Sequence, residues 1–229
     1  GAVKISNANG YANGYDVMIA KRIAEELGKE LVIMKYEFNS LINAVQAGTL
    51  DFIIAGMSPT AERRESIDFS DAYYESNLVV VVREDGKYAD ATSLADFSGA
   101  TLVAQMGTFH DKALQEQAAD FGITRGTPMD TFPMMTMALS TGAIDGYIAE
   151  QPGAIADCAS VDGLKYIPLV NNDTGFQNIS PEDVQIAVGV KKGSDVTGQI
   201  NAALAKISAA ERDEMMENAI RLATGENVQ

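Results

Sequence analysis

Helical and strand segments alternate along this chain, and the alternation limits the possible folds more than any other feature. Residues 15–27 carry apolar side chains close to every 3.6 residues, the period of an amphipathic helix, with Asp16 as the expected N-cap. Short apolar strands follow at 31–34 and 51–55, separated by a second helix over 39–47. Helices and strands in this order predict βαβ units and a parallel sheet.

A second series of the same kind begins after Arg83. The expected strands of this series lie at 101–104, 145–149 and 165–168, and the expected helices at 93–97, 109–121, 134–140 and from 153 onward. A long strand over 184–190 and two C-terminal helices, at about 194–208 and 210–222, complete the chain. The sequence therefore predicts two α/β sets.

The first series is too small to be a stable sheet by itself, because only two clear strands precede residue 78. The strand over 184–190 and the helices after it could complete that sheet. We therefore predict a discontinuous first lobe with a second lobe inserted into it. The boundaries that we expect are 1–82 plus 184–229 for the first lobe, 83–183 for the second, and a hinge near 82–84 and 182–185.

Three loops that follow strands are the expected ligand-binding positions, because ligands of open α/β sheets bind at the carboxyl ends of strands. These loops lie at 55–63, 105–110 and 149–152. If they face each other across the hinge, they would form an interlobe cleft.

The composition excludes several classes of function. The net charge is −15, from 17 basic and 32 acidic residues, and such a chain would repel a nucleic-acid backbone. A single cysteine, Cys158, excludes an internal disulfide and a Cys-rich zinc site. The single histidine, His110, has no identifiable partner for a Ser-His-Asp or Cys-His arrangement. We expect no enzyme activity, no catalytic residue, no metal and no cofactor.

Five stretches of the chain resemble a known family. They read GYDV at 14–17, DFIIAGMSPTAERR at 51–64, IDFSDAYY at 67–74, GAIDGYIAEQP at 142–152 and VGVKKGSD at 188–195. In this order the chain resembles the extracellular amino-acid-binding proteins of ABC importers, family 3 of the bacterial solute-binding proteins. The resemblance implies an α/β, two-lobed type II periplasmic-binding-protein-like fold, with each lobe a mostly parallel sheet flanked by helices. It also implies binding of an amino acid in the interlobe cleft and delivery to an ABC permease.

Two departures from the family pattern affect the expected site. Relatives begin with a strand and an aromatic loop before the Gly14 motif, whereas this chain starts at Gly1-Ala2-Val3-Lys4. We therefore predict that the N-terminal strand is missing. In addition, Glu150 stands where the family often has aspartate.

The resemblance assigns the ligand's carboxylate to Arg63, and a guanidinium binds a carboxylate through two parallel hydrogen bonds. Backbone N–H groups and hydroxyls of Ser58 and Thr60 would complete the carboxylate site, and Gly56 would let the chain approach the ligand closely. The alternative is that Arg63 is one of several surface charges over 61–65.

On the second lobe, the resemblance assigns the α-ammonium group to Glu150, and the alternative is a carboxylate that stabilises a helix N-terminus. Thr108, with the Gly107 backbone, would face the carboxylate, and the alternative is a helix N-cap. Gln105 is expected to contact the ligand's side chain. The aromatic residues Phe38 and Phe109 are expected to line the pocket, and core packing is the alternative for Phe38.

We rank basic amino acids first as the ligand and polar ones such as glutamine second. One alternative is a cyclohexadienyl-type dehydratase on the same fold, with Glu150 as general acid and Arg63 holding a carboxylate. A second alternative is a sensor ligand-binding domain. We expect a monomer outside the cytoplasm, either lipid-anchored on a Gram-positive cell surface or periplasmic.

Overall fold

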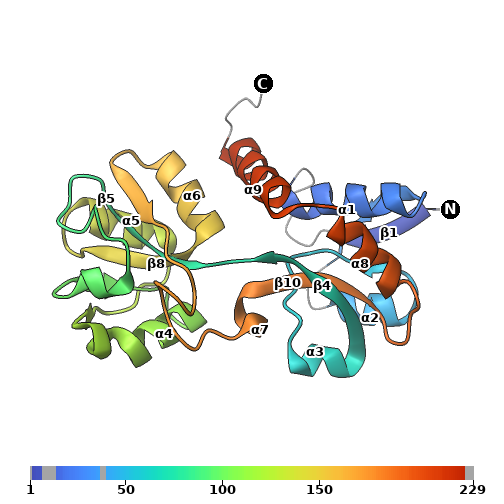
Figure 1. The fold of residues 1–229 in the computed structure, drawn as a ribbon, viewed down its shortest axis with the longest axis horizontal. Helices are drawn as coiled ribbons and strands as arrows, with labels where there is room; N and C mark the ends of the chain where they lie inside the picture. The colour runs from blue at the N-terminus through green and yellow to red at the C-terminus, as the bar shows by residue number, and fades with distance from the viewer. Residues whose placement is uncertain (1, 7–13, 37–39, 225–229) are drawn as a thin grey trace. The chain divides into compact units, whose positions relative to one another are not determined.

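The computed structural model describes residues 2–6, 14–36 and 40–224 (Figure 1). The chain forms two compact units. Unit 1 comprises Gly1–Glu75 and Pro181–Gln229, and unit 2 comprises Ser76–Ser180. Over the described residues, each unit contains one five-stranded sheet.

The sheet of unit 1 has the order β2-β1-β3-β10-β4. Its strands are β1 (Ala2–Ser6), β2 (Glu30–Met34), β3 (Phe52–Ile53), β4 (Ile67–Glu75) and β10 (Gln185–Lys191). Strand β1 runs parallel to β2 and β3, whereas β10 runs antiparallel to β3 and β4. The helices of this unit are α1 (Tyr15–Glu26), α2 (Leu41–Gln46), α3 (Ala61–Ser66), α7 (Pro181–Val184), α8 (Thr197–Ala205) and α9 (Ala209–Thr224).

The segment Ala2–Ser6 forms strand β1 of this sheet, and the expectation that the family's own first strand is missing stays a prediction. Strand β1 is present over Ala2–Ser6 and pairs with the full length of β2, from Ala2 opposite Glu30 to Ser6 opposite Met34. Lys4 lies at the centre of this segment, which therefore has no continuous apolar run. The segment is identified as a strand by its pairing with β2 and β3 and not by its composition. Residues 7–13, which follow β1, lie outside the described part of the chain.

The sheet of unit 2 has the order β7-β6-β8-β5-β9. Its strands are β5 (Leu78–Arg83), β6 (Thr101–Val103), β7 (Thr124–Arg125), β8 (Gly146–Glu150) and β9 (Leu164–Ile167). Strand β6 runs parallel to β7 and β8, and β5 runs antiparallel to β8 and β9. The helices are η2 (Leu94–Phe97), α4 (Phe109–Gln117), η3 (Ala118–Phe121), α5 (Phe132–Ser140) and α6 (Gln151–Ser160).

Each sheet is mostly parallel, as expected: four of its five strands run in one direction, and only β10 in unit 1 and β5 in unit 2 run antiparallel to their two neighbours. One sequence-based expectation, the boundary between the units, needs correction. The strand over 78–82 belongs to unit 2, so the first junction falls after Glu75. The physical reason is burial: residues 78–82 are at most 1% exposed, and β8 and β9 cover both edges of β5.

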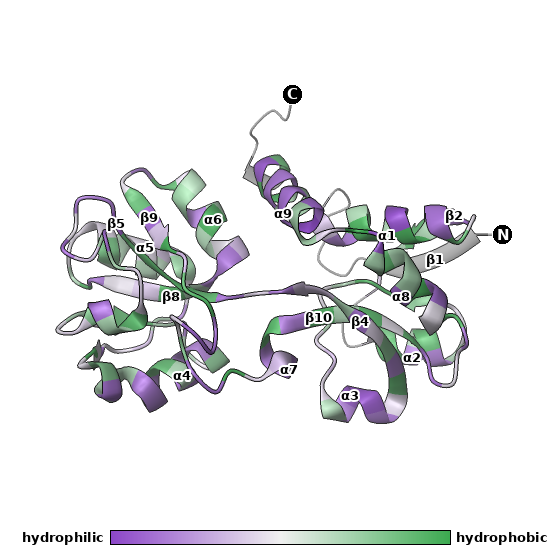
Figure 2. Ribbon diagram, in the orientation of Figure 1, coloured by the Kyte–Doolittle hydropathy of each residue, from purple (hydrophilic) through white to green (hydrophobic). Residues whose placement is uncertain are grey.

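The core of unit 1 explains the pattern of its helices. The apolar face of α1, with Ile19 and Ile23, packs into a cluster that also contains Val188 of β10. Helix α9 carries both hydrophilic and hydrophobic residues (Figure 2). Met215 and Met216 pack against this cluster, and the acidic residues on either side of them are exposed. The acidic segment is therefore amphipathic and not solvated on every side.

Candidate functional site

The loop after β3 carries the candidate residues of unit 1. Gly56 adopts a left-handed backbone with φ of +62°, which glycine tolerates better than other residues. Its N–H donates to the Tyr73 hydroxyl at 3.4 Å. Thr60 is the N-cap of α3, and its Oγ1 accepts the N–H of Arg63 at 3.2 Å. The loop thus ends in a helix that begins two residues before Arg63.

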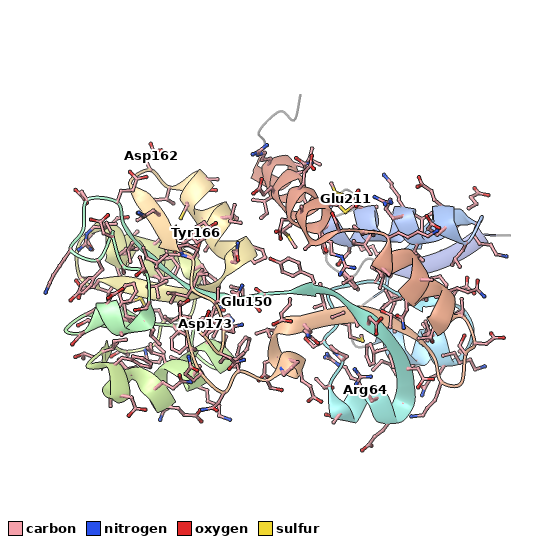
Figure 3. The ribbon with its side chains drawn as sticks, in the orientation of Figure 1. Arg64, Glu150, Asp162, Tyr166, Asp173 and Glu211 are labelled. Carbon is pink, nitrogen blue, oxygen red and sulfur yellow. The ribbon has the colours of Figure 1, made fainter. Side chains whose placement is uncertain are left out.

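Two neighbouring arginines of α3 have different surroundings. The Arg63 side chain is half-buried, and its Nη1 donates to the carbonyl oxygen of Ser58 at 2.9 Å. Arg64 is exposed, its Nε donates to the carbonyl oxygen of Pro59 at 3.1 Å, and its guanidinium lies over the Phe69 ring at 5.5 Å from the centroid (Figure 3). Arg63 is therefore held against the loop that was predicted to bind a carboxylate, whereas Arg64 packs on an aromatic ring.

The candidate residues of unit 2 lie at one edge of its sheet. Strands β6 and β8 are parallel neighbours, so the loop after β6 and the end of β8 meet at the same edge. The Thr108 hydroxyl donates to the carbonyl oxygen of Gln105 at 2.7 Å and accepts the N–H of Asp111 at 3.3 Å. Thr108 is thus the N-cap of α4, which is the alternative that the sequence offered, and a ligand-binding role remains a prediction.

Residues beside this turn are held by local contacts. The Gln105 side chain donates to the carbonyl oxygen of Asp130 at 2.9 Å. Phe109 is half-buried and meets the His110 ring edge-on, with 4.4 Å between centroids. His110 is 7% exposed, and neither ring nitrogen has a hydrogen-bond partner among the described residues. Burial lowers the pKa of His110 to about 4, so the imidazole is neutral near pH 7.

Glu150 ends β8 and occupies the N-cap position of α6 (Figure 3), but its carboxylate forms no capping hydrogen bond. Burial raises the pKa of the Glu150 carboxyl. A carboxylate that has lost hydration in this way is stabilised by a bound cation, since an opposite charge favours the ionised form. The ammonium-binding role of Glu150 stays a prediction.

Sequence reasoning missed one contact behind the unit 1 loop. Tyr73 is fully buried and donates its hydroxyl hydrogen to Asp16 Oδ1 at 2.6 Å. Asp16 was expected to be the N-cap of α1, but Gly14 occupies that position. The stretches GYDV and IDFSDAYY contain both residues, which is the sequence signal that was available. Phe38 lies outside the described residues, so its expected role is not examined by the structure.

Other classes of site were searched in the described part of the chain. Within residues 2–6, 14–36 and 40–224, no group of three or more His, Cys, Asp or Glu side chains is placed to hold a metal ion. Among the helices that the structure describes, none has the length and apolar character required to cross a bilayer.

Known proteins resemble this chain over most of its length. It is 28% identical over 191 residues to the arginine-binding extracellular protein ArtP of Bacillus subtilis, covering 83% of this chain and 71% of that protein. It is 26% identical over 221 residues to the ABC transporter glutamine-binding protein GlnH of Bacillus subtilis, covering 93% and 75%. Among solved structures, the second substrate binding domain of a putative amino acid ABC transporter from Streptococcus pneumoniae is 27% identical, with a TM-score of 0.79, covering 96% of this chain and 100% of that chain.

The match to a family profile is equally extensive. The family described as bacterial extracellular solute-binding proteins, family 3, matches residues 3–219. The match covers most of both segments of unit 1 and all of unit 2. This chain therefore belongs to the family 3 bacterial extracellular solute-binding proteins.

Proposed function

We propose that this chain binds a free amino acid and delivers it to the membrane permease of an ABC importer. The observation that carries the proposal is a pair of opposite charges at strand-end loops. The Arg63 guanidinium is half-buried beside the Ser58 carbonyl, and the Glu150 carboxylate is partly dehydrated at the end of β8. These two groups match the two charges that every free amino acid carries.

In this proposal Arg63 binds the α-carboxylate, together with Ser58 and Thr60. The Gly107-Thr108 turn adds main-chain N–H groups, because the first N–H groups of α4 have no partner within the helix. Glu150 binds the α-ammonium group. Both sets contact the same ligand, so the zwitterion is fixed by its two charges and its side chain is recognised by other residues.

Basic amino acids are the first choice of ligand and polar ones such as glutamine the second. The similarity to an arginine-binding protein and to a glutamine-binding protein supports both. The net charge of −15 favours a cationic ligand through long-range attraction. Gln105, Phe109 and Phe38 are the proposed contacts of the ligand's side chain.

The proposal also includes a location and an assembly state. We place the protein outside the cytoplasm, anchored by lipid to a Gram-positive cell surface or dissolved in a periplasm. It acts as a monomer and its partner is the permease. The family's description as extracellular supports the location.

A dehydratase acting on cyclohexadienyl acids is the second candidate, and one observation favours it. A general acid needs a pKa raised toward neutrality, and burial raises the pKa of Glu150. Incubation with such acids tests this directly. Release of the aromatic product by wild-type protein, and its loss in Glu150→Gln, would support the enzyme over the receptor.

A thermal-unfolding screen against the twenty amino acids tests the proposed function. A ligand present at one hundred times its Kd stabilises the native state by about 2.7 kcal/mol. For a protein of this size, 1 kcal/mol raises Tm by roughly 2–4 °C, so the expected rise is several degrees. The proposal predicts this rise for arginine, lysine or glutamine. If no amino acid raises Tm and calorimetry detects no binding heat, the proposed function is wrong.

A further inference from the structure

Three groups of unit 1 form a chain of hydrogen bonds that ends at the start of the Arg63 loop. The Tyr73 hydroxyl, on β4, donates to Asp16 Oδ1 at 2.6 Å. The Tyr73 hydroxyl oxygen also accepts the N–H of Gly56 at 3.4 Å. Three segments that are distant in sequence, namely α1, β4 and the loop after β3, therefore meet at one phenol oxygen.

The direction of this chain follows from the chemistry of a phenol, which has one hydrogen to donate and lone pairs that accept. Burial raises the pKa of Tyr73 well above its ordinary value, so the hydroxyl keeps its hydrogen. Asp16 accepts that hydrogen and fixes the rotation of the O–H bond. The phenol oxygen therefore turns a lone pair toward Gly56.

The Gly56 peptide is the place where this contact matters for the loop. Its positive φ turns the chain from β3 into the segment that contains Ser58 and Thr60. The Ser58 carbonyl holds the Arg63 guanidinium, and the Thr60 hydroxyl caps the helix that carries Arg63. The loop has one more main-chain anchor, since the Met57 carbonyl accepts the N–H of Ala187. The phenol thus fixes the orientation of the peptide at which the loop begins.

We propose that Asp16 and Tyr73 are positioning residues for amino-acid binding, which act through the Gly56 peptide on the loop that carries Arg63. Tyr73 contacts the loop through its hydroxyl oxygen, and Asp16 acts through Tyr73. This inference rests on the proposed function, because it assumes that Arg63 binds the ligand's carboxylate.

The test removes the phenol oxygen and keeps the ring. Tyr73→Phe preserves the ring's packing against Tyr15, whose centroid is 5.9 Å away, and leaves the Gly56 N–H without its acceptor. We expect Kd for the best ligand of the wild-type protein to rise about tenfold, the factor that corresponds to one lost hydrogen bond. We also expect the Gly56 amide proton to move upfield and to exchange faster with solvent, in ligand-free protein labelled with ¹⁵N-glycine. Loss of one cross-peak in Gly56→Ala identifies that resonance.

Tyr147→Phe is a matched control in unit 2. Tyr147 is as deeply buried as Tyr73, at 0% exposure, and it also donates its hydroxyl hydrogen to a carboxylate, Asp157 Oδ2, at 2.8 Å. Both substitutions should lower Tm. The control should leave Kd within about twofold of wild type and the Gly56 resonance unmoved, so a general loss of stability is separated from positioning.

A second pair of variants changes Asp16, at the other end of this series of hydrogen bonds. These variants keep the inference testable if Tyr73→Phe folds poorly. Asp16 is only partly buried, and Asp16→Asn keeps an oxygen that accepts from the Tyr73 hydroxyl. We expect Asp16→Asn to bind nearly as wild type and to leave the Gly56 resonance close to its position. Asp16→Ala should weaken binding and shift the Gly56 resonance in the same direction as Tyr73→Phe.

The outcomes separate this inference from the proposed function. If wild type binds an amino acid and Tyr73→Phe binds it within twofold of wild type, the inference is overturned and the proposed function stands. An unmoved Gly56 resonance in Tyr73→Phe also overturns the inference, with or without a ligand. If wild type binds no amino acid, the proposed function fails. The Gly56 resonance is measured on ligand-free protein and therefore does not depend on that result.

Discussion

Replacing Arg63 by alanine should remove most of the affinity for an amino acid and leave the fold intact. The guanidinium is half-buried, and the contact with the Ser58 carbonyl at 2.9 Å holds it against its own loop. The substitution therefore removes both a preorganised cation and the hydrogen bond to the Ser58 carbonyl. These two losses have different magnitudes, and the difference makes the prediction testable.

The loss in binding is the larger of the two. Truncating one partner of a dehydrated, hydrogen-bonded charge pair costs about 2–5 kcal/mol. At 1.4 kcal/mol for each factor of ten, Kd should rise about 30- to 4,000-fold. The loss in ligand-free stability includes the partly exposed hydrogen bond to Ser58, and one such bond is worth about 1 kcal/mol. That corresponds to a fall in Tm of roughly 2–4 °C.

Isothermal titration calorimetry with the best ligand of the screen measures the first quantity, and ligand-free thermal unfolding measures the second. Arg64→Ala is the matched control, because it removes the same side chain from the next position of α3, where the guanidinium lies over the Phe69 ring. Its Kd should stay within about threefold of wild type. A Kd for Arg63→Ala that is also within threefold, or an equal loss in both variants, would refute the assignment of Arg63.

Three further predictions concern stability. Burial raises the pKa of Glu150, so the wild-type protein loses stability as pH rises through this raised pKa and the carboxyl ionises. Glu150→Gln should therefore have a higher ligand-free Tm than wild type at pH 7 and the same Tm near pH 3. Equal Tm values at pH 7 would contradict a pKa raised by burial. The pKa of His110 is lowered to about 4, so protonation of its imidazole should reduce the free energy of unfolding of wild type by about 3 kcal/mol as pH falls from 6.5 to below 4. Urea unfolding of His110→Gln should show a smaller reduction over the same pH range. An identical reduction would argue against a buried neutral imidazole. Gly146→Ala places a methyl group 2.8 Å from Val80 Cγ1 and 2.9 Å from the Val81 carbonyl oxygen, so urea unfolding should show about 1–3 kcal/mol of destabilisation, and an unchanged midpoint would mean that the strands separate without cost.

The tertiary structure places residues that periodicity cannot place. Strand β5 is a continuous apolar run, and such a run identifies a buried strand without saying which sheet contains it. Pairing with β8 and β9 puts it in unit 2, contrary to the sequence-based boundary. Strand β1 has the opposite difficulty, since Lys4 interrupts its apolar pattern and only its two parallel partners identify it.

The candidate site shows the same division. Thr108 was recognisable as a residue that precedes a helix, and it caps α4 in the structure. Thr60 also caps a helix, α3, which the sequence analysis did not predict. The contact between Asp16 and Tyr73 joins residues 57 positions apart, and nothing in their spacing along the chain predicts it.

By itself, the sequence determined the α/β class, most helices and strands, the family and the two charged residues proposed to bind the ligand. These features depend on the periodicity of apolar residues, on residue type and on the order of motifs, all of which can be read from the sequence. The tertiary structure alone decided which strands pair, which unit contains β5, and which groups hold the loop that carries Arg63. Those features depend on contacts between distant segments, where burial and hydrogen-bond satisfaction select one arrangement among many that the local pattern allows.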